Sequence, residues 1–104
     1  MIYIVDIDDT ICKMVDSENL DYTENLPYPN RIKHFNDLLS QGHEVHYWTA
    51  RGAVTGIDWY DLTEQQLRDW GANYTSLRVG DKPHYDYWID DKAINVETYF
   101  GDNK

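Results

Sequence analysis

The chain opens with an apolar β-type run that ends abruptly in carboxylates, and this feature constrains the fold more than any other. Residues 2–10 read Ile-Tyr-Ile-Val-Asp-Ile-Asp-Asp-Thr. The aliphatic side chains fit a strand that is buried on both faces, as in a parallel sheet. We therefore expect a strand over residues 2–7 whose carboxyl end leads directly into an acidic turn.

Two of these carboxylates are spaced so that both can bind the same ligand. Asp6 and Asp8 are two residues apart, so on an extended backbone they point to the same side. Ligands of open α/β sheets bind at the carboxyl ends of strands, where these side chains emerge. Because neighbouring carboxylates repel each other and a divalent cation relieves the repulsion, we expect a hard oxygen-ligand site for Mg²⁺. The alternative is a solvated, Asp-rich turn.

The rest of the chain alternates predicted helices and strands. Apolar spacing and flanking Pro and Gly residues predict helices over 30–41, 60–70 and 92–100 and further strands over 43–48, 74–79 and 87–90. Thr63 is the expected N-cap of the second helix. This alternation predicts one α/β domain over residues 1–104, with a parallel sheet flanked by helices. The long polar connection over 11–28 is expected to be a flap or binding loop.

Composition narrows the classes of function. The net charge of −10 argues against an extended nucleic-acid surface, since phosphate contacts need Lys and Arg, but it leaves room for a small phosphorylated ligand. The single cysteine, Cys12, excludes an internal disulfide and suits a reducing cytosol. No signal-peptide pattern and no run of about 18 apolar residues is present, so we expect a cytoplasmic protein without a membrane span. A thin, aromatic-rich core is compatible with a homo-oligomer.

Polar residues follow three of the predicted strands, and a parallel sheet would gather them at one edge. They are Asp6, Asp8, Thr10, Thr49, Arg51, Asp90 and Asp91, with Lys82 joining from the loop before the last strand.

This set of residues suits hydrolysis of a phosphate monoester. Mg²⁺ between Asp6, Asp90 and the phosphate would remove charge repulsion and polarise phosphorus. Lys82 would add positive charge, and the Thr49 hydroxyl would donate a hydrogen bond to a phosphoryl oxygen. Asp6 is the candidate nucleophile. Asp8 is the candidate acid that protonates the leaving oxygen and then the base that activates water.

These motifs resemble the haloacid dehalogenase (HAD) superfamily of phosphatases. Asp6-Ile7-Asp8-Asp9-Thr10 is similar to its first motif, Asp-x-Asp-x-Thr; Thr49-Ala50-Arg51 is similar to the second, Lys82 to the third and Ile89-Asp90-Asp91 to the acidic fourth. The resemblance implies a Rossmann-like core and a Mg²⁺-dependent phosphohydrolase with Asp6 as nucleophile and Asp8 as acid/base. It further implies that Asp90 binds the metal directly, that Asp91 does so directly or through water, and that the Asp8 main-chain carbonyl is another ligand.

Two departures from the family pattern matter. Asp9 stands where the family often has Gly, although Asp tolerates the left-handed geometry that Gly would serve. Asp81 with Asp86 offers a second acidic spacing, but Asp90 and Asp91 are favoured because they follow an apolar run after Lys82. The chain also has no room for a cap domain. Small capless relatives in this superfamily act in sugar-phosphate and surface-polysaccharide metabolism, and others process nucleic-acid ends or phosphoproteins. The chain looks most like the polysaccharide group, which implies a small phosphorylated metabolite as substrate.

Other interpretations stay open. Related chemistry would serve a phosphatase of nucleotides or nucleic-acid ends. A non-catalytic phosphoacceptor, or an acidic mimic of nucleic acid, would belong to a different class. Arg51 is expected either to contact the substrate or to pair with Asp58 or Glu44, and Thr10 is expected to contact the substrate.

Overall fold

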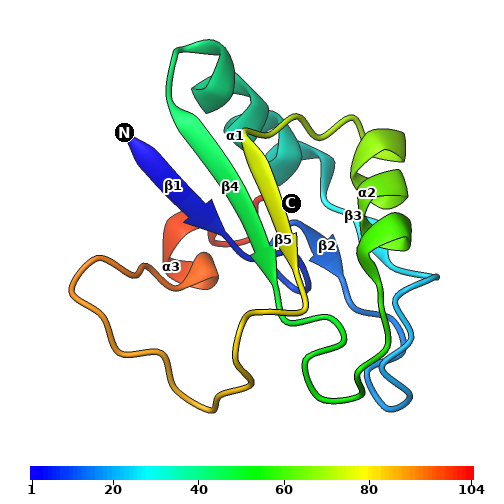
Figure 1. The fold of residues 1–104 in the computed structure, drawn as a ribbon. Coiled ribbons are helices and arrows are strands. Elements are labelled where there is room, and N and C mark those ends of the chain that lie inside the picture. The colour runs from blue at the N-terminus through cyan, green and yellow to red at the C-terminus, as the bar shows by residue number, and fades with distance from the viewer.

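A parallel sheet forms the centre of the fold (Figure 1). The computed structural model describes residues 1–104. Strands β1 (Ile2–Val5), β4 (Glu44–Thr49) and β5 (Ser76–Val79) form a three-stranded sheet in the order β1-β4-β5. All neighbours are parallel, and His46 pairs with Ile4 on one side and Ser76 on the other. The predicted α/β class is confirmed.

Three helices follow the sequence expectations with shifted ends. Helix α1 spans Pro29–Ser40, α2 spans Tyr60–Asp69 and α3 spans Val96–Phe100. Pro29 lies in the first turn of α1, where its missing N–H costs no hydrogen bond. The last helix begins later than predicted because the Asn95 side chain caps it by accepting from the Glu97 N–H. Thr63 is not an N-cap: α2 starts after Trp59, and Thr63 is buried within the helix.

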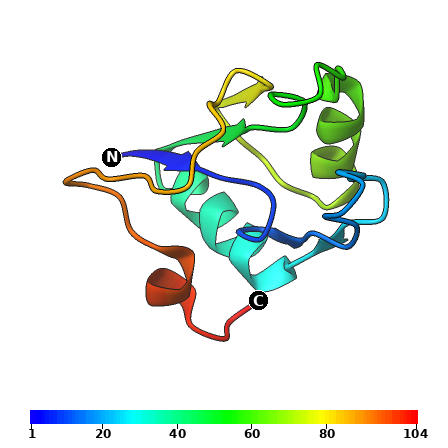
Figure 2. The ribbon, with the colours of Figure 1, turned by 90° about the horizontal axis from the view of Figure 1, so that it is seen from below.

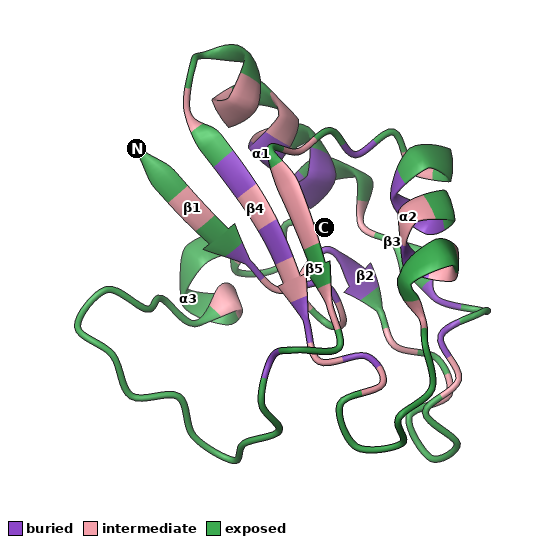
Figure 3. Cartoon of the chain, viewed as in Figure 1, coloured by how far each residue is buried: buried purple, intermediate pink, exposed green.

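The core lies between one face of the sheet and the helices α1 and α2, and the other face of the sheet is less covered. Val45, Tyr47 and Phe35 belong to this core, whereas Ile2 and Ile4 are 65% and 62% exposed. In Figure 2 α1 lies against one side of the sheet, and Figure 3 shows exposed residues along β1. The expectation that the first strand is buried on both faces is therefore wrong. The strand lies at the sheet edge, and only one of its faces is covered.

The long connection over residues 11–28 is partly ordered as a small hairpin. Strand β2 (Cys12–Lys13) pairs antiparallel with β3 (Leu26–Pro27), and residues 14–25 form a turn-rich excursion between them. We call residues 14–25 the flap. Both ends of the flap are thus held close to the carboxyl end of β1.

The predicted fourth strand is absent. Residues 80–95 contain no helix or strand, and Tyr87 and Ile89 are 87% and 95% exposed. The Asp90 carboxylate accepts the Lys92 N–H at 2.8 Å, which forms a local turn instead of a ladder. A short apolar run resembles a strand in sequence, but it becomes one only when a neighbouring strand pairs with its backbone. No partner strand does so here.

Two isoleucines, one in β1 and one just after it, differ in burial, and this difference can be tested. Ile7 is fully buried, whereas Ile4 is exposed. We expect Ile7→Ala to lower the free energy of unfolding by about 2–5 kcal/mol, and Ile4→Ala to lower it by less than about 1 kcal/mol. Urea denaturation of both variants checks this. Equal costs would show that the face carrying Ile4 is covered in solution.

Candidate active site

The carboxyl ends of β1 and β4 and the loop after β5 enclose one pocket. Its volume is about 240 Å³, and its lining combines residues far apart in the chain. The sequence-predicted site residues in its wall are Asp6, Asp8, Thr49, Arg51 and Lys82. The wall also includes Leu20 and Tyr22 of the flap, His84 and Tyr85 of the loop after β5, and residues of the loop after β4. The parallel sheet thus brings these predicted residues together.

Asp6 lines this pocket and lies next to a positively charged side chain. Lys82 Nζ donates to Asp6 Oδ1 at 3.2 Å, and the Thr10 hydroxyl donates to Oδ2 at 3.1 Å. Burial raises the pKa of Asp6, and the charge of Lys82 opposes that rise. Thr10 therefore orients the Asp6 carboxylate, and its predicted contact with a substrate stays a prediction.

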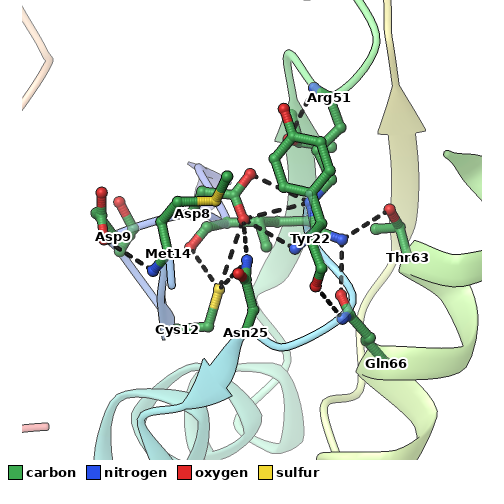
Figure 4. A network of polar contacts seen from close by, with 12 residues as sticks. Asp8, Asp9, Cys12, Met14, Tyr22, Asn25, Arg51, Thr63 and Gln66 are labelled. Atoms are coloured by element: carbon green, nitrogen blue, oxygen red, sulfur yellow. Dashed lines mark hydrogen bonds and ion pairs between the residues drawn. The ribbon is translucent and has the colours of Figure 1, made fainter. Parts of the chain in front are cut away.

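Asp8 is bound by a buried arginine (Figure 4). Arg51 Nη2 donates to Asp8 Oδ1 at 2.8 Å, and Nε donates to Oδ2 at 3.1 Å. Arg51 Nη1 donates to Thr63 at 3.0 Å and to Gln66 at 2.7 Å. The guanidinium also lies 4.7 Å from the centre of the Tyr22 ring. The arginine is 1% exposed, and a buried cation needs such partners to offset its lost hydration.

Pairing of Arg51 with Asp58 or Glu44 is therefore wrong. The partner is Asp8, which the fold brings to the same sheet edge. One N–H of Nη2 has no protein partner, so a contact of Arg51 with a substrate stays a prediction.

Thr49 and Asp9 flank this centre in different ways. Thr49 is 1% exposed and its Oγ1 accepts the Arg51 N–H at 3.2 Å, so its hydroxyl hydrogen is left for another acceptor. Asp9 has a φ of 61°, a left-handed geometry that Asp tolerates better than most residues. Its carboxylate accepts the Met14 N–H at 3.0 Å and supports the start of the flap.

The structure does not bring Asp90 and Asp91 to the pocket. Both are exposed in the segment without regular structure, because the strand that would carry them is absent. The alternative pair also lies elsewhere. Asp81 accepts from Trp48 Nε1 at 2.7 Å and from Arg78 Nη2 at 2.6 Å, and Asp86 is exposed. The hydrogen bond from Arg78 holds the pKa of Asp81 below its usual range.

The oxygen ligands at the pocket fit a cation that is also bound by substrate phosphate better than a cation bound by protein ligands alone. No group of three acidic, His or Cys residues lies close enough to hold a metal ion. Mg²⁺, however, is commonly bound by one or two carboxylates together with substrate phosphates and water. The Asp6 carboxylate lines the pocket and would serve as one such ligand, and the resemblance described above implies the Asp8 main-chain carbonyl as another.

Several residues around Asp8 were not foreseen from the sequence. Asn25 Nδ2 donates to Asp8 Oδ1 at 2.8 Å, and Cys12 Sγ lies 3.7 Å from the same oxygen. Thr63 and Gln66 are three residues apart on α2 and face Arg51 together. Two polar residues at this spacing on the buried side of a helix are the one sequence signal that would have predicted a polar partner there.

Comparisons with known proteins support the fold and leave the family open. No protein-family model matches the chain. A Bacillus cereus protein named "Putative nucleotidase" is 28% identical over 92 residues, which are 77% of this chain and 47% of that protein. The chain thus spans about half the length of this relative. A crystal structure of a structural-genomics target from Vibrio cholerae superimposes with a TM-score of 0.78 at 23% identity, covering 94% of this chain and 85% of that one.

None of the helices has the length and apolar character that a membrane span requires.

The ion pair of Asp8 with Arg51 predicts a strong response to its removal. We expect Arg51→Met to lower the free energy of unfolding by about 3 kcal/mol, because it leaves the Asp8 carboxylate without its charged partner. This value is at the low end for a broken buried ion pair, since Asp8 keeps 20% of its side chain exposed. Arg51→Met combined with Asp8→Asn should cost less than the sum of the two single changes. Chemical denaturation of the four proteins measures this, and strict additivity would contradict the pair.

Cys12 provides a probe of the packing under the flap. It is fully buried, and burial with the neighbouring charge of Asp8 raises the pKa of its thiol to about 12. At pH 8 almost no thiolate is present, so we expect a maleimide or disulfide reagent to react only after denaturant is added. Rapid labelling of the native protein would show that the flap opens readily.

Proposed function

We propose that this protein is a phosphomonoester hydrolase of the haloacid dehalogenase type that acts through a phosphoaspartyl intermediate on Asp6. The single observation that carries the proposal is the arrangement at the end of β1. A carboxylate in an open pocket contacts Lys82, and a second carboxylate two residues later lines the same pocket. Nucleophilic displacement at a phosphate needs a nucleophile, a positive charge and a proton donor side by side.

The first step transfers the phosphoryl group to the protein. A carboxylate oxygen of Asp6 attacks phosphorus, the bond from phosphorus to the ester oxygen breaks, and Asp8 gives a proton to the departing oxygen. Lys82 and the Thr49 hydroxyl stabilise the charge on the phosphoryl oxygens. Mg²⁺, held by Asp6 and the Asp8 main-chain carbonyl, would neutralise the negative charge shared by substrate and carboxylate.

The second step returns the protein to its starting state. Asp8, now a carboxylate, takes a proton from a water molecule, and the water oxygen attacks phosphorus of the acyl phosphate. The bond from phosphorus to Asp6 breaks, inorganic phosphate leaves and Asp6 is again a carboxylate. Each proton that Asp8 gives in the first step is thereby recovered in the second.

The proposed substrate is a small phosphorylated metabolite such as a sugar phosphate. A pocket of about 240 Å³ lies just below the usual size range of ligand pockets, which favours a small substrate. The net charge of −10 disfavours long polyanions. A nucleoside monophosphate is the second candidate. The Bacillus cereus relative is named as a putative nucleotidase. Tyr85 lies in the pocket wall and is 42% exposed, so its side chain is the candidate to stack on a base.

Hydrolysis of p-nitrophenyl phosphate tests the proposed reaction. We expect turnover by the wild-type chain with Mg²⁺, its loss with EDTA, and a fall in kcat on the order of 10⁴-fold or more in Asp6→Asn. Asp102→Asn is the matched control, because Asp102 is an exposed aspartate outside the pocket. Full activity of Asp6→Asn would rule out a phosphoaspartate at this residue.

A side-by-side assay separates the two substrate classes. Release of phosphate from hexose phosphates and from nucleoside monophosphates is measured at equal concentrations, with the wild type and with Tyr85→Ala. If nucleotides are the substrates, Tyr85→Ala should raise KM for nucleotides by about tenfold, in line with the loss of one base-stacking contact, and leave hexose phosphates unaffected. A preference for hexose phosphates would favour the first class.

A further inference from the structure

The two oxygens of the Asp8 carboxylate have unequal surroundings. Oδ1 accepts from Asn25 Nδ2 at 2.8 Å and from Arg51 Nη2 at 2.8 Å, and Arg51 Nε and Cys12 Sγ lie 3.3 and 3.7 Å away. Oδ2 accepts only from Arg51 Nε at 3.1 Å. A carboxylate oxygen has two lone pairs for hydrogen bonds. Those of Oδ1 are therefore occupied, and Oδ2 keeps one free.

The Asn25 amide can take only one orientation. Its Oδ1 accepts the Val15 N–H at 3.3 Å, and its Nδ2 lies against Asp8 and Cys12 Sγ. Turning the amide by 180° would place its oxygen against the Asp8 carboxylate and its NH₂ group against the Val15 N–H, two unfavourable contacts. Asn25 is 6% exposed, so water does not relieve them. The amide nitrogen is therefore committed to Asp8.

The same network attaches the flap to α2. Gln66 Nε2 donates to the Tyr22 main-chain carbonyl at 2.7 Å, while Gln66 Oε1 accepts from Arg51. Figure 4 shows Tyr22, Asn25 and Gln66 grouped around Arg51 and Asp8. The flap thus reaches Asp8 from one side and α2 reaches it, through Arg51, from the other.

We infer that Asn25 is a positioning residue that, together with Arg51, turns Oδ1 of Asp8 away from the reaction and leaves Oδ2 as the oxygen that exchanges the proton. This inference rests on the proposed function. The proton given to the leaving oxygen comes from Oδ2, and the proton taken from water returns to Oδ2. Without Asn25, only Arg51 holds the carboxyl group, and Oδ1 regains a free lone pair that can take the proton in place of Oδ2.

The loss of hydrolysis rate on removal of Asn25 should depend on how much the leaving group needs a proton. Nitrophenolate is a stable anion and leaves without one, whereas phenolate and alkoxides gain more from a general acid. A misplaced Asp8 therefore slows the hydrolysis of phenyl phosphate more than that of p-nitrophenyl phosphate. A merely structural role of Asn25 would slow both alike.

The test compares three variants on these two esters in the presence of Mg²⁺. In Asn25→Ala we expect kcat to fall about tenfold or more for phenyl phosphate and less than about threefold for p-nitrophenyl phosphate, with KM unchanged. Asn25→Asp, which keeps the acceptor for Val15 but places a second carboxylate against Asp8, should show the same split more strongly. Asn19→Ala alters an exposed asparagine of the same flap and should leave both values at the wild-type level.

A measurement without turnover accompanies the assay. In a double-mutant cycle of Asn25→Ala with Asp8→Asn, unfolding by urea should reveal coupling on the order of tenfold in the unfolding equilibrium constant, as for a hydrogen bond to a charged group. If the wild type turns over both esters but Asn25→Ala lowers kcat equally for the two, the positioning role of Asn25 is overturned and the proposed function stands. The same holds if Asn25 and Asp8 show no coupling. If Asn25 and Asp8 are coupled but the wild type hydrolyses neither ester, the proposed function is overturned. The role of Asn25 in proton transfer then falls with it, and the hydrogen bond is structural only.

Discussion

The ion pair between Asp8 and Arg51 is the interaction on which the rest of the site depends. It joins the acidic turn after β1 to the polar turn after β4, at the edge where the parallel strands end. Because Arg51 is buried, it also needs partners on its other nitrogen, and Thr63 and Gln66 of α2 provide them. Sheet, helix and flap therefore meet at one guanidinium, and none of the three can shift without breaking a charged hydrogen bond.

This arrangement gives Asp6 and Asp8 different surroundings, which suit the two roles proposed for them. Asp6 contacts the ammonium group of Lys82, a largely buried residue that lines the pocket, and it keeps 39% of its own side chain exposed. Asp8 is bound to a planar, rigid donor and has less freedom. A reactive nucleophile has to remain accessible, whereas a proton-transferring group benefits from one fixed direction. The same residue type thus acquires two environments through its neighbours alone.

The predicted helices α1 and α2 agree with the structure. The predicted strands agree only in part, because a strand also needs a partner strand that the local sequence does not specify. Helical spacing predicted α1 and α2 to within a residue at most ends, and the strands around β4 and β5 were anticipated. The predicted strand over 87–90 is wrong, because its apolar residues have no partner strand and lie exposed. The burial of Ile2 and Ile4 was also overestimated, since a sequence does not reveal which strand lies at a sheet edge.

The sequence by itself determined the α/β class and the order of chemically able residues along the chain. Short-range patterns carry that information, because apolar periodicity, prolines, glycines and strand-end acids act within a few residues. Only the tertiary structure decided which of these residues meet. It paired Arg51 with Asp8, brought Asn25 to the same carboxylate and left Asp90 and Asp91 in solvent. The partner of a buried charge depends on packing between elements that are distant in sequence, and no local pattern encodes that distance.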